Sequence, residues 1–564
     1  MSAPAAATAP GARLGAGERP GARRRRVEDL PALAAIAATT LWHLWILRGH
    51  FHGYVLAFHD LGIISDWFTN AIYHGRPFWI TELGINHMSV HFTPTVIALT
   101  PFYLLTQSQY VLCVLGALEI AAALYVGHRF LVRLLARRGA APALAAAVST
   151  VLILFVSLNP YVKTVIGSVH IEALYVPLAL ALFYVVVFSE RFWLAALLAV
   201  LALGVREDAG IYLALQCLAL AFVPRDLFAN RRRALRCAWL LAAVSLTWVV
   251  LVVKVVNPWV FGVTENHVQR GWGQWGDTWA QVVWHQATSP LQLARALGYS
   301  AMPALNAWFL FAPWLVHPLF GLCVNVPGLL LWSASPVDKR MLWFYNAAFL
   351  LPGFLLGLYL AVDRLAGLWP RLAARLPRLG RLTPGQQIGG VLLAGGLLLA
   401  APLHELRNTV EGPGMYGRRF QPSAWADEHA IAHWLRRCPP GTSVATDFRR
   451  IVLLPNRITR YLLRHARDAD VVLIFRQVDP FFSGHDSAEE LWRLLEGDPA
   501  FQLRRESPDV RIYARPGVTC LAVTDPPRPA APPSAAAGGR TAAAAAATSP
   551  PRPPSRSGRP SSRS

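Results

Sequence analysis

The residues best suited to chemistry gather in residues 58–94, directly after the first long apolar run. This stretch is polar, although 54% of the chain is hydrophobic. Its acids are Asp60, Asp66 and Glu82, and its histidines are His59, His74, His87 and His91, with His52 just upstream. Acids and imidazoles are the usual groups for moving protons or contacting charged ligands. The pattern favours a catalytic loop.

Asp60 is the first catalytic candidate, in the sequence His59-Asp60-Leu61-Gly62. A carboxylate near a bilayer surface can take a proton from an acceptor hydroxyl, and partial desolvation raises its pKa towards a useful value. The alternative is an acid that only caps a helix.

His91 lies four residues after His87, a metal-ligand spacing if the segment is helical. We favour loop histidines that contact phosphate. No specific motif supports a divalent metal, and the cofactor is unknown.

Two further groups of charged residues interrupt apolar runs. His170 and Glu172 open a helix, where an acid can also be a simple cap. Arg206, Glu207 and Asp208 stand together between two apolar stretches, which is costly unless the charges are paired or functional. Arg206 is suited to bidentate phosphate binding, and the structural alternative is a charge-paired turn. We predict Glu172 as a second catalytic acid and the other four as substrate-binding residues.

The elements that must position these residues are membrane helices. The mean hydropathy is +0.37 and only 15% of residues are charged, against about 25% in soluble domains. Apolar runs of about 18 residues or more, enough to cross a bilayer, recur along the chain. The net charge of +21 comes from short arginine clusters between these runs. Such clusters are typical of cytoplasmic loops, and nucleic-acid binding is not expected.

The sequence therefore predicts a polytopic α-helical membrane protein with about 11 spans, its N-terminus in the cytoplasm. A segment at 93–106 is too short to cross and is expected at the interface. The expected spans are about 31–47, 109–131, 140–158, 172–189, 192–205, 209–223, 237–256, 301–317, 319–333, 345–363 and 387–403. With this count the arginine clusters fall on the cytoplasmic side. The same count places six residues at the outer ends of helices: Asp60, His91, His170, Glu172, Glu207 and Asp208.

The chain divides by composition into four parts. Residues 1–27 and 525–564 are basic or Pro/Ala/Ser/Arg-rich tails, expected to be disordered. Residues 28–403 form the membrane domain, with outer loops at 48–94 and 257–300. Residues 404–524 alternate short strands and helices, which predicts a small extracytoplasmic α/β domain. Cys438 and Cys520 lie in this domain, and the spacing leaves open whether they pair.

Seven short motifs resemble a bacterial and archaeal family of polytopic membrane proteins of unknown function, DUF 2079. They are HDLG (59–62), HGRPF (74–78), HFTP (91–94), HIEAL (170–174), REDAG (206–210), SPVDKRMLWFYNAAFLLP (335–352) and ATDFRR (445–450). That family is in turn similar to membrane glycosyltransferases of the GT-C fold. The resemblance implies that Asp60 and Glu172 are the catalytic acids and that the donor is a polyprenyl-phosphate sugar.

The expected function is sugar transfer from such a lipid carrier to an acceptor on the outer face of the cell membrane. One alternative is a transporter or lipid flippase that uses Glu119, an acid in the middle of an apolar run. Another is a non-catalytic membrane protein that presents the C-terminal domain. The sugar and the acceptor cannot be read from the residues.

Overall fold

The computed structural model describes residues 28–53, 58–262, 273–291, 307–334, 348–394 and 425–520, with short gaps inside several of these ranges. Several expectations lie outside the described residues. They are both tails, Glu82, residues 395–424 and the side chains of His52, His59 and Asp60.

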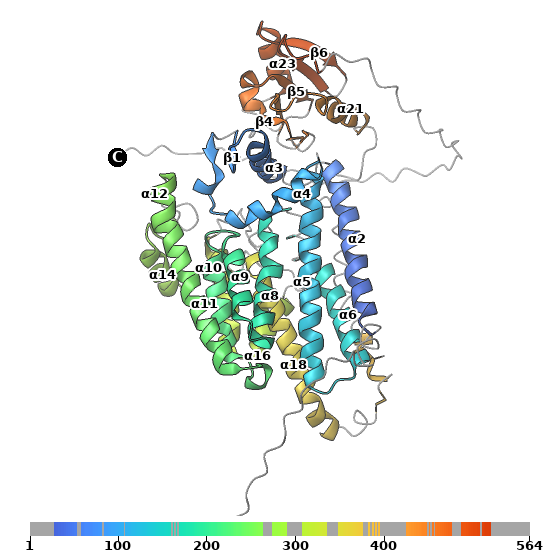
Figure 1. Cartoon of the computed structure of the whole chain (residues 1–564), viewed down its shortest axis with the longest axis vertical. Helices are drawn as coiled ribbons and strands as arrows, with labels where there is room; N and C mark the ends of the chain where they lie inside the picture. Colours follow the sequence, from blue (N-terminus) through green and yellow to red (C-terminus); the bar gives the residue numbers. More distant parts are fainter. Residues whose placement is uncertain are drawn as a thin grey trace, which may run out of the picture. The chain divides into compact units, whose positions relative to one another are not determined.

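Long helices occupy almost every expected span that is described (Figure 1). They are α2 (Leu30–Gly53), α5 (Tyr110–Arg137), α6 (Pro142–Leu158), α8 (Tyr175–Phe188), α9 (Phe192–Leu203), α10 (Ala209–Ala219), α11 (Arg231–Leu251), α16 (Ala307–Val316), α17 (Pro318–Ala334) and α18 (Leu351–Arg375). Five described helical segments are long and apolar enough to cross a membrane, and four further apolar helices are shorter. Several apolar helices are thus established, and the count of about 11 spans stays a prediction.

Helix α5 is central to this bundle, because it packs against α2, α6, α8 and α18. Ion pairs join the arginine-rich end of α5 to neighbouring segments. Arg138 makes two hydrogen bonds to the buried carboxylate of Asp363 on α18, at 2.9 and 2.7 Å, and an ion pair with the exposed Asp226 at 2.9 Å. These pairs connect segments that are distant in the sequence.

The expectation of a loop over residues 48–94 is wrong for residues 58–73. They form helix α3 (Phe58–Tyr73), followed by a hairpin of β1 (Trp79–Ile80) and β2 (Ile85–Asn86). Leu61, Ile64 and Phe68 are buried along one face of α3. Their spacing is that of an amphipathic helix, a signal that the polar residues between them obscure. Helices α12 (Asn257–Phe261) and α14 (Trp279–Thr288) likewise lie in the expected loop 257–300.

The segment expected at the interface forms two short helices, η2 (Pro94–Leu99) and α4 (Thr100–Leu104). Proline stands in the first turn of each, where its missing N–H costs nothing. Ile97 and Leu105 are among its exposed apolar side chains. This short, outward-facing apolar surface is consistent with a helix at a bilayer interface.

Residues 425–520, which we call the α/β region, contain a five-stranded sheet in the order β4-β3-β5-β7-β6. The strands are β3 (Ser443–Thr446), β4 (Thr459–Leu462), β5 (Val471–Phe475), β6 (Gln502–Glu506) and β7 (Val510–Ala514), and the helices are α21 (Trp425–Leu435) and α23 (Ala488–Glu496). β3 pairs in parallel with β4 and β5, and β7 is antiparallel to its neighbours. The region belongs to the same compact unit as the helices.

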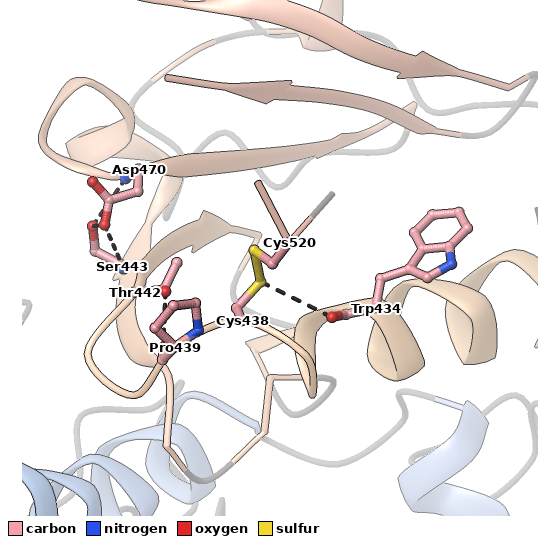
Figure 2. Close-up of a disulfide and its surroundings, with 7 residues drawn as sticks. All are labelled: Trp434, Cys438, Pro439, Thr442, Ser443, Asp470 and Cys520. Carbon is pink, nitrogen blue, oxygen red and sulfur yellow. Dashed lines mark hydrogen bonds between the residues drawn. A yellow bond between two sulfur atoms is a disulfide. The ribbon is translucent and has the colours of Figure 1, made fainter. Parts of the chain in front are cut away.

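A disulfide joins Cys438, just after α21, to Cys520 at the end of the described chain (Figure 2). The two half-cystines are 82 residues apart, and their Cα atoms are 4.8 Å apart, within the usual range for a disulfide. The sequence left this pairing open. The bond ties together the two ends of the α/β region.

Gly210 allows the closest helix contact near the charged turn 206–208. A Cβ on Gly210 would lie 2.3 Å from the backbone oxygen of Ser245 on α11. Since a backbone atom cannot move aside cheaply, Gly210→Ala should destabilise the protein by at least about 2 kcal/mol. The thermal midpoint of the purified protein in detergent measures this.

Gly116→Ala is the matched control, because nothing lies within 4 Å of a Cβ at this position in α5. It should leave the midpoint unchanged or raise it slightly, since alanine is the better helix former by about 0.5–1 kcal/mol. Equal midpoints for the two variants would contradict the close approach of α10 and α11.

Candidate active site

A buried arginine stands at the centre of the charged residues. Arg206 lies in the turn between α9 and α10, and its side chain is 5% exposed. Its Nε and Nη2 each donate to one carboxylate oxygen of Asp208, both at 2.6 Å. Its Nη1 donates to Oε1 of Glu172 at 3.0 Å. One guanidinium thus binds two carboxylates from separate segments.

Glu172 belongs to a short 3-10 helix, η3 (Ile171–Leu174), that leads into α8. Its Oε2 lies 2.5 Å from Nδ1 of His170. Neither His170 at the start of η3 nor Asp208 at the start of α10 makes a side-chain cap hydrogen bond. Helix capping was the alternative for His170 and Glu172. For residues 206–208 the structural alternative was a charge-paired turn, and the contact of Arg206 with Asp208 fits that alternative.

The third carboxylate, Glu207, binds the segment after the hairpin. Its Oε1 lies 2.8 Å from Nδ1 of His91, and its Oε2 accepts a hydrogen bond from the backbone N–H of Phe92 at 2.9 Å. The side chain of His91 is 39% exposed and that of Glu207 is 14% exposed. His91 is therefore the more accessible member of this pair.

The charges of His91 and Glu207 stabilise each other. Burial alone lowers the pKa of His91, but the charge of Glu207 and the hydrogen bond to it outweigh burial, so this pKa lies above its ordinary value of 6.5. Burial raises the pKa of Glu207, but His91 and Arg206 outweigh it and bring this pKa down to about 2. Each partner therefore favours the charged form of the other.

The pKa of His87 is shifted in the opposite direction from that of His91. Burial lowers its pKa to about 3, with a smaller contribution from the nearby His91 charge. Its ring lies 3.9 Å from that of Trp67 on α3 and 5.7 Å from that of His91. His87 is thus a neutral imidazole between the rings of Trp67 and His91.

Backbone contacts fix the His91 segment against the charged turn. Thr95, at the start of η2, donates its backbone N–H to the carbonyl of Gly204 at 2.9 Å and its hydroxyl to the carbonyl of Leu201 at 2.8 Å. These carbonyls end α9, directly before Arg206. The polar end of α9 therefore holds both halves of the His91–Glu207 pair.

The sequence analysis missed the aromatic residues beneath Arg206. The guanidinium carbon of Arg206 lies 4.6 Å from the ring centroid of Phe349. Tyr212 stacks on Phe349 at 5.1 Å, and Tyr175 approaches it at 4.9 Å. Gln216 donates to the carbonyl of Phe349 at 2.8 Å and accepts from the Tyr175 hydroxyl at 3.1 Å. Phe349 belongs to the motif at residues 335–352, and this motif is the sequence signal that could have pointed to it.

Two residues beside the site have a left-handed backbone that non-glycine residues rarely adopt. Val169, with φ of 48°, directly precedes His170. Phe78, with φ of 61°, accepts the backbone N–H of His87 through its carbonyl at 2.7 Å. Such strain persists only where surrounding contacts enforce it, and it concentrates at functional sites.

The structure brings six of the seven predicted site residues into linked contacts. They are His91, His170, Glu172, Arg206, Glu207 and Asp208. Asp60 lies in the first turn of α3, and its side chain is outside the described part. Asp66 is not in this cluster, because it contacts Thr81 and Arg460 instead.

Glu119 lies half-buried on α5, the helix that packs against η3. Among the described residues, no group of three or more His, Cys, Asp or Glu side chains is placed to hold a metal ion.

Comparison with known proteins places the chain in a family. The family model described as "Predicted membrane protein (DUF2079)" matches residues 54–498. The chain belongs to this family. The match includes every candidate site residue, and it makes the DUF2079 chain a membrane protein by family as well as by composition.

No curated protein matches the chain. Two solved structures are similar to it at 13% identity, both of ArnT from Cupriavidus metallidurans. The one bound to undecaprenyl phosphate has a TM-score of 0.41 and covers 84% of this chain and 97% of its own. The apo structure has a TM-score of 0.36 and covers 81% and 93%.

Removing Arg206 should be strongly destabilising. Arg206→Met leaves the buried Glu172 and the Asp208 carboxylate without their cation, which typically costs about 3–5 kcal/mol. The thermal midpoint of the purified variant measures the loss. Arg233→Met is the control, because Arg233 pairs with Glu190 at an exposed position and should cost less than about 1 kcal/mol. Equal effects would contradict a buried ionic centre.

The His91–Glu207 pair predicts a pH window. The raised pKa of His91 means that its stabilising effect is full below pH 6.5 and is lost as pH rises through its folded-state pKa. The lowered pKa of Glu207 means that its effect is present above its ordinary 4.5 and is lost as pH falls towards about 2.

Glu207→Gln should lower the pKa of His91 to 6.5 or below, because burial then acts without its acidic partner. Histidine-selective NMR titration measures this value, with Asp277→Asn as the control at an exposed acid outside the cluster. An unchanged His91 pKa in Glu207→Gln would show that the pair does not form.

Proposed function

We propose that this DUF2079 protein is a membrane glycosyltransferase of the GT-C type. It would move a sugar from a polyprenyl-phosphate carrier to an acceptor at the extracytoplasmic face. The observation that carries the proposal is the contact network of His91, His170, Glu172, Arg206, Glu207 and Asp208. Three acids and two histidines around one arginine, at the ends of apolar helices, suit acid–base chemistry on a lipid-linked, phosphate-bearing substrate.

The two ends of α8 support an extracytoplasmic site. One end is next to Glu172, and at the other end the ring of Phe188 lies 4.9 Å from the guanidinium carbon of Arg133 and 4.8 Å from that of Arg137. Arginine-rich ends are typical of the cytoplasmic side, which favours an extracytoplasmic position for the acidic cluster.

The disulfide supports the same orientation independently. Structural disulfides form in oxidising compartments such as the bacterial periplasm or cell surface. Cys438 and Cys520 are in the α/β region, which contacts α3 and therefore lies at the end of the bundle that carries the cluster. Charge pattern and cysteine chemistry thus both favour an outer-face site.

We assign roles that fit the contacts. Asp60, in the first turn of α3, is proposed as the general base that takes the proton of the acceptor hydroxyl. The acceptor oxygen then bonds to the anomeric carbon as the bond from that carbon to the phosphate oxygen breaks, and polyprenyl phosphate leaves. Glu172 is proposed as the second acid, held by His170 and Arg206.

The phosphate contact is proposed for His91 rather than for Arg206. The side chain of His91 is 39% exposed and its pKa is raised by Glu207, whereas Nε, Nη1 and Nη2 of Arg206 already donate to carboxylates. Arg206 would therefore hold Glu172 and Asp208 in place and would act on the substrate only through them. His170, Glu207 and Asp208 remain proposed as residues of the substrate-binding site.

The test is transfer by the purified protein in lipid nanodiscs. A panel of sugars linked to undecaprenyl phosphate serves as donors, and the release of undecaprenyl phosphate is measured. Asp60→Asn should reduce release by about 100-fold or more, the usual effect of losing a general base. Asp277→Asn, which removes an exposed acid in another loop, should retain wild-type release. Full activity of Asp60→Asn would rule out this mechanism.

A further inference from the structure

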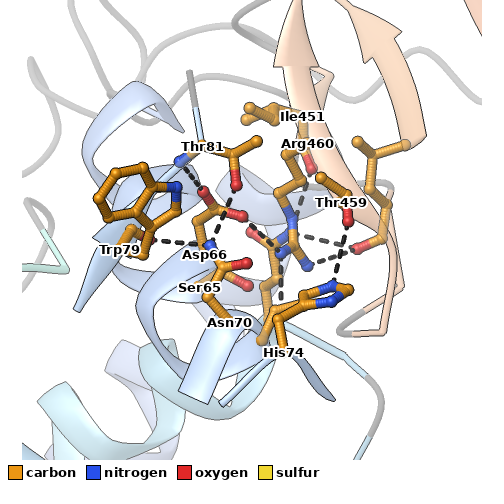
Figure 3. A network of polar contacts seen from close by, with 12 residues as sticks. Ser65, Asp66, Asn70, His74, Trp79, Thr81, Ile451, Thr459 and Arg460 are labelled. Atoms are coloured by element: carbon orange, nitrogen blue, oxygen red, sulfur yellow. Dashed lines mark hydrogen bonds and ion pairs between the residues drawn. The ribbon is translucent and has the colours of Figure 1, made fainter. Parts of the chain in front are cut away.

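A buried polar network joins the α/β region to α3 (Figure 3). Its centre is Arg460 in β4, whose side chain is 1% exposed. Its Nη1 donates to the hydroxyl of Thr69 on α3 at 2.9 Å and lies 3.9 Å from Oδ1 of Asp66. Its Nη2 donates to the carbonyl of Pro455 at 3.0 Å. A guanidinium so fully buried is costly unless such partners are present.

Asp66 continues the network from α3 to the hairpin. Its Oδ2 accepts the backbone N–H of Thr81, directly after β1, at 2.7 Å. One turn further along α3, the amide of Asn70 donates to the carbonyl of Trp79 at 2.9 Å and to the hydroxyl of Thr81 at 3.0 Å. The face of α3 that contacts Arg460 therefore also holds the hairpin.

The hairpin leads straight into the candidate site. β2 ends at Asn86, whose side chain accepts the backbone N–H of Met88 at 2.9 Å and so caps the 3-10 turn η1 (His87–Ser89). Trp67, the neighbour of Asp66 on α3, contacts the ring of His87. The backbone N–H of His91 in turn donates to the carbonyl of His87 at 2.8 Å.

A second set of contacts fixes the α/β region against the same helices. The side-chain amide of Gln109, at the start of α5, donates to the carbonyls of Ile451 and Leu454 at 3.1 and 3.2 Å. A Cβ on Gly62 of α3 would lie 2.8 Å from the side chain of Ile451. The segment 451–460 is therefore in direct contact with α3, the helix that carries Asp60.

We propose that Arg460 is a positioning residue, through which the α/β region holds α3, the hairpin and hence His87 and His91 in their places in the site. This inference rests on the proposed function in one respect: it calls the site of His87 and His91 an active site. The connection runs from Arg460 through Asp66 and Thr69 to Thr81 and Trp67. A change at Arg460 should thus loosen His87, although the two residues do not touch.

The experiment measures the modification rate of single histidines by diethyl pyrocarbonate, followed by mass spectrometry on the purified full chain at pH 7. Neutral imidazoles react, and His87 is protected in the native state by burial against Trp67. Arg460→Gln should raise the rate at His87 about tenfold, because it leaves a buried charge network incomplete. Arg460→Lys, which keeps the charge, should restore part of the protection.

The internal reference is His465, which lies in the α/β region with a side chain that is 35% exposed. If Arg460 served only the stability of the α/β region, the rate at His465 would change and that at His87 would not. Arg511→Gln is the matched control variant, because Arg511 pairs with Glu496 and Glu506 inside the same region. It should leave His87 protected.

Wild-type protection of His87 in folded Arg460→Gln would overturn the proposal. If that variant does not fold, Thr69→Val and Asp66→Asn remove the α3 side of the network and leave β4 unchanged. Wild-type protection in both of these would overturn it equally. No donor or acceptor is used, so the proposal can hold even if sugar transfer is never observed, and sugar transfer can hold even if the proposal fails.

Discussion

The pairing of Arg206 with two carboxylates is the constraint on which the rest of the site depends. A guanidinium that is 5% exposed at the end of apolar helices is tolerated only with its counter-charges in place. Glu172 comes from η3 and Asp208 from the start of α10, so both segments must be correctly placed at once. The adjacent Glu207 then reaches His91, which adds a third segment. The positions of these side chains are therefore set by the need of each buried charge for an opposite charge.

The apolar surroundings strengthen the same arrangement. The ring of Phe349 lies against Arg206, and Tyr175 and Tyr212 enclose that ring, so little water reaches the inner side of the ion pairs. Electrostatic interactions are stronger in such a setting than in water. His91 is the more exposed member of its pair, and Glu207 favours its protonated form. A preorganised, accessible imidazole is what the proposed binding of a lipid phosphate would need.

Helix positions and the polar cluster were predictable from the sequence, because hydrophobic length and isolated charges are local signals. REDAG and HIEAL stand out against apolar neighbours, and their residues meet as expected. Helix α3 was missed because its apolar face, with Leu61, Ile64 and Phe68, alternates with polar residues. Strand β4 was missed because a charged residue, Arg460, occupies one of its buried positions. No local pattern could give the contact of Arg460 with Thr69, since 391 residues separate them.

Arg460 joins the α/β region to the helices, whereas Arg206 joins η3 to the turn before α10. Each is buried, and each takes one partner from a separate segment: Arg206 takes Glu172 from η3, and Arg460 takes Thr69 from α3. Trp67 and the hairpin lie between the two centres, because they contact His87 on one side and adjoin Asp66 on the other. A site built this way cannot be reduced to a membrane half and an outer half, because the segment that carries its histidines is held from both.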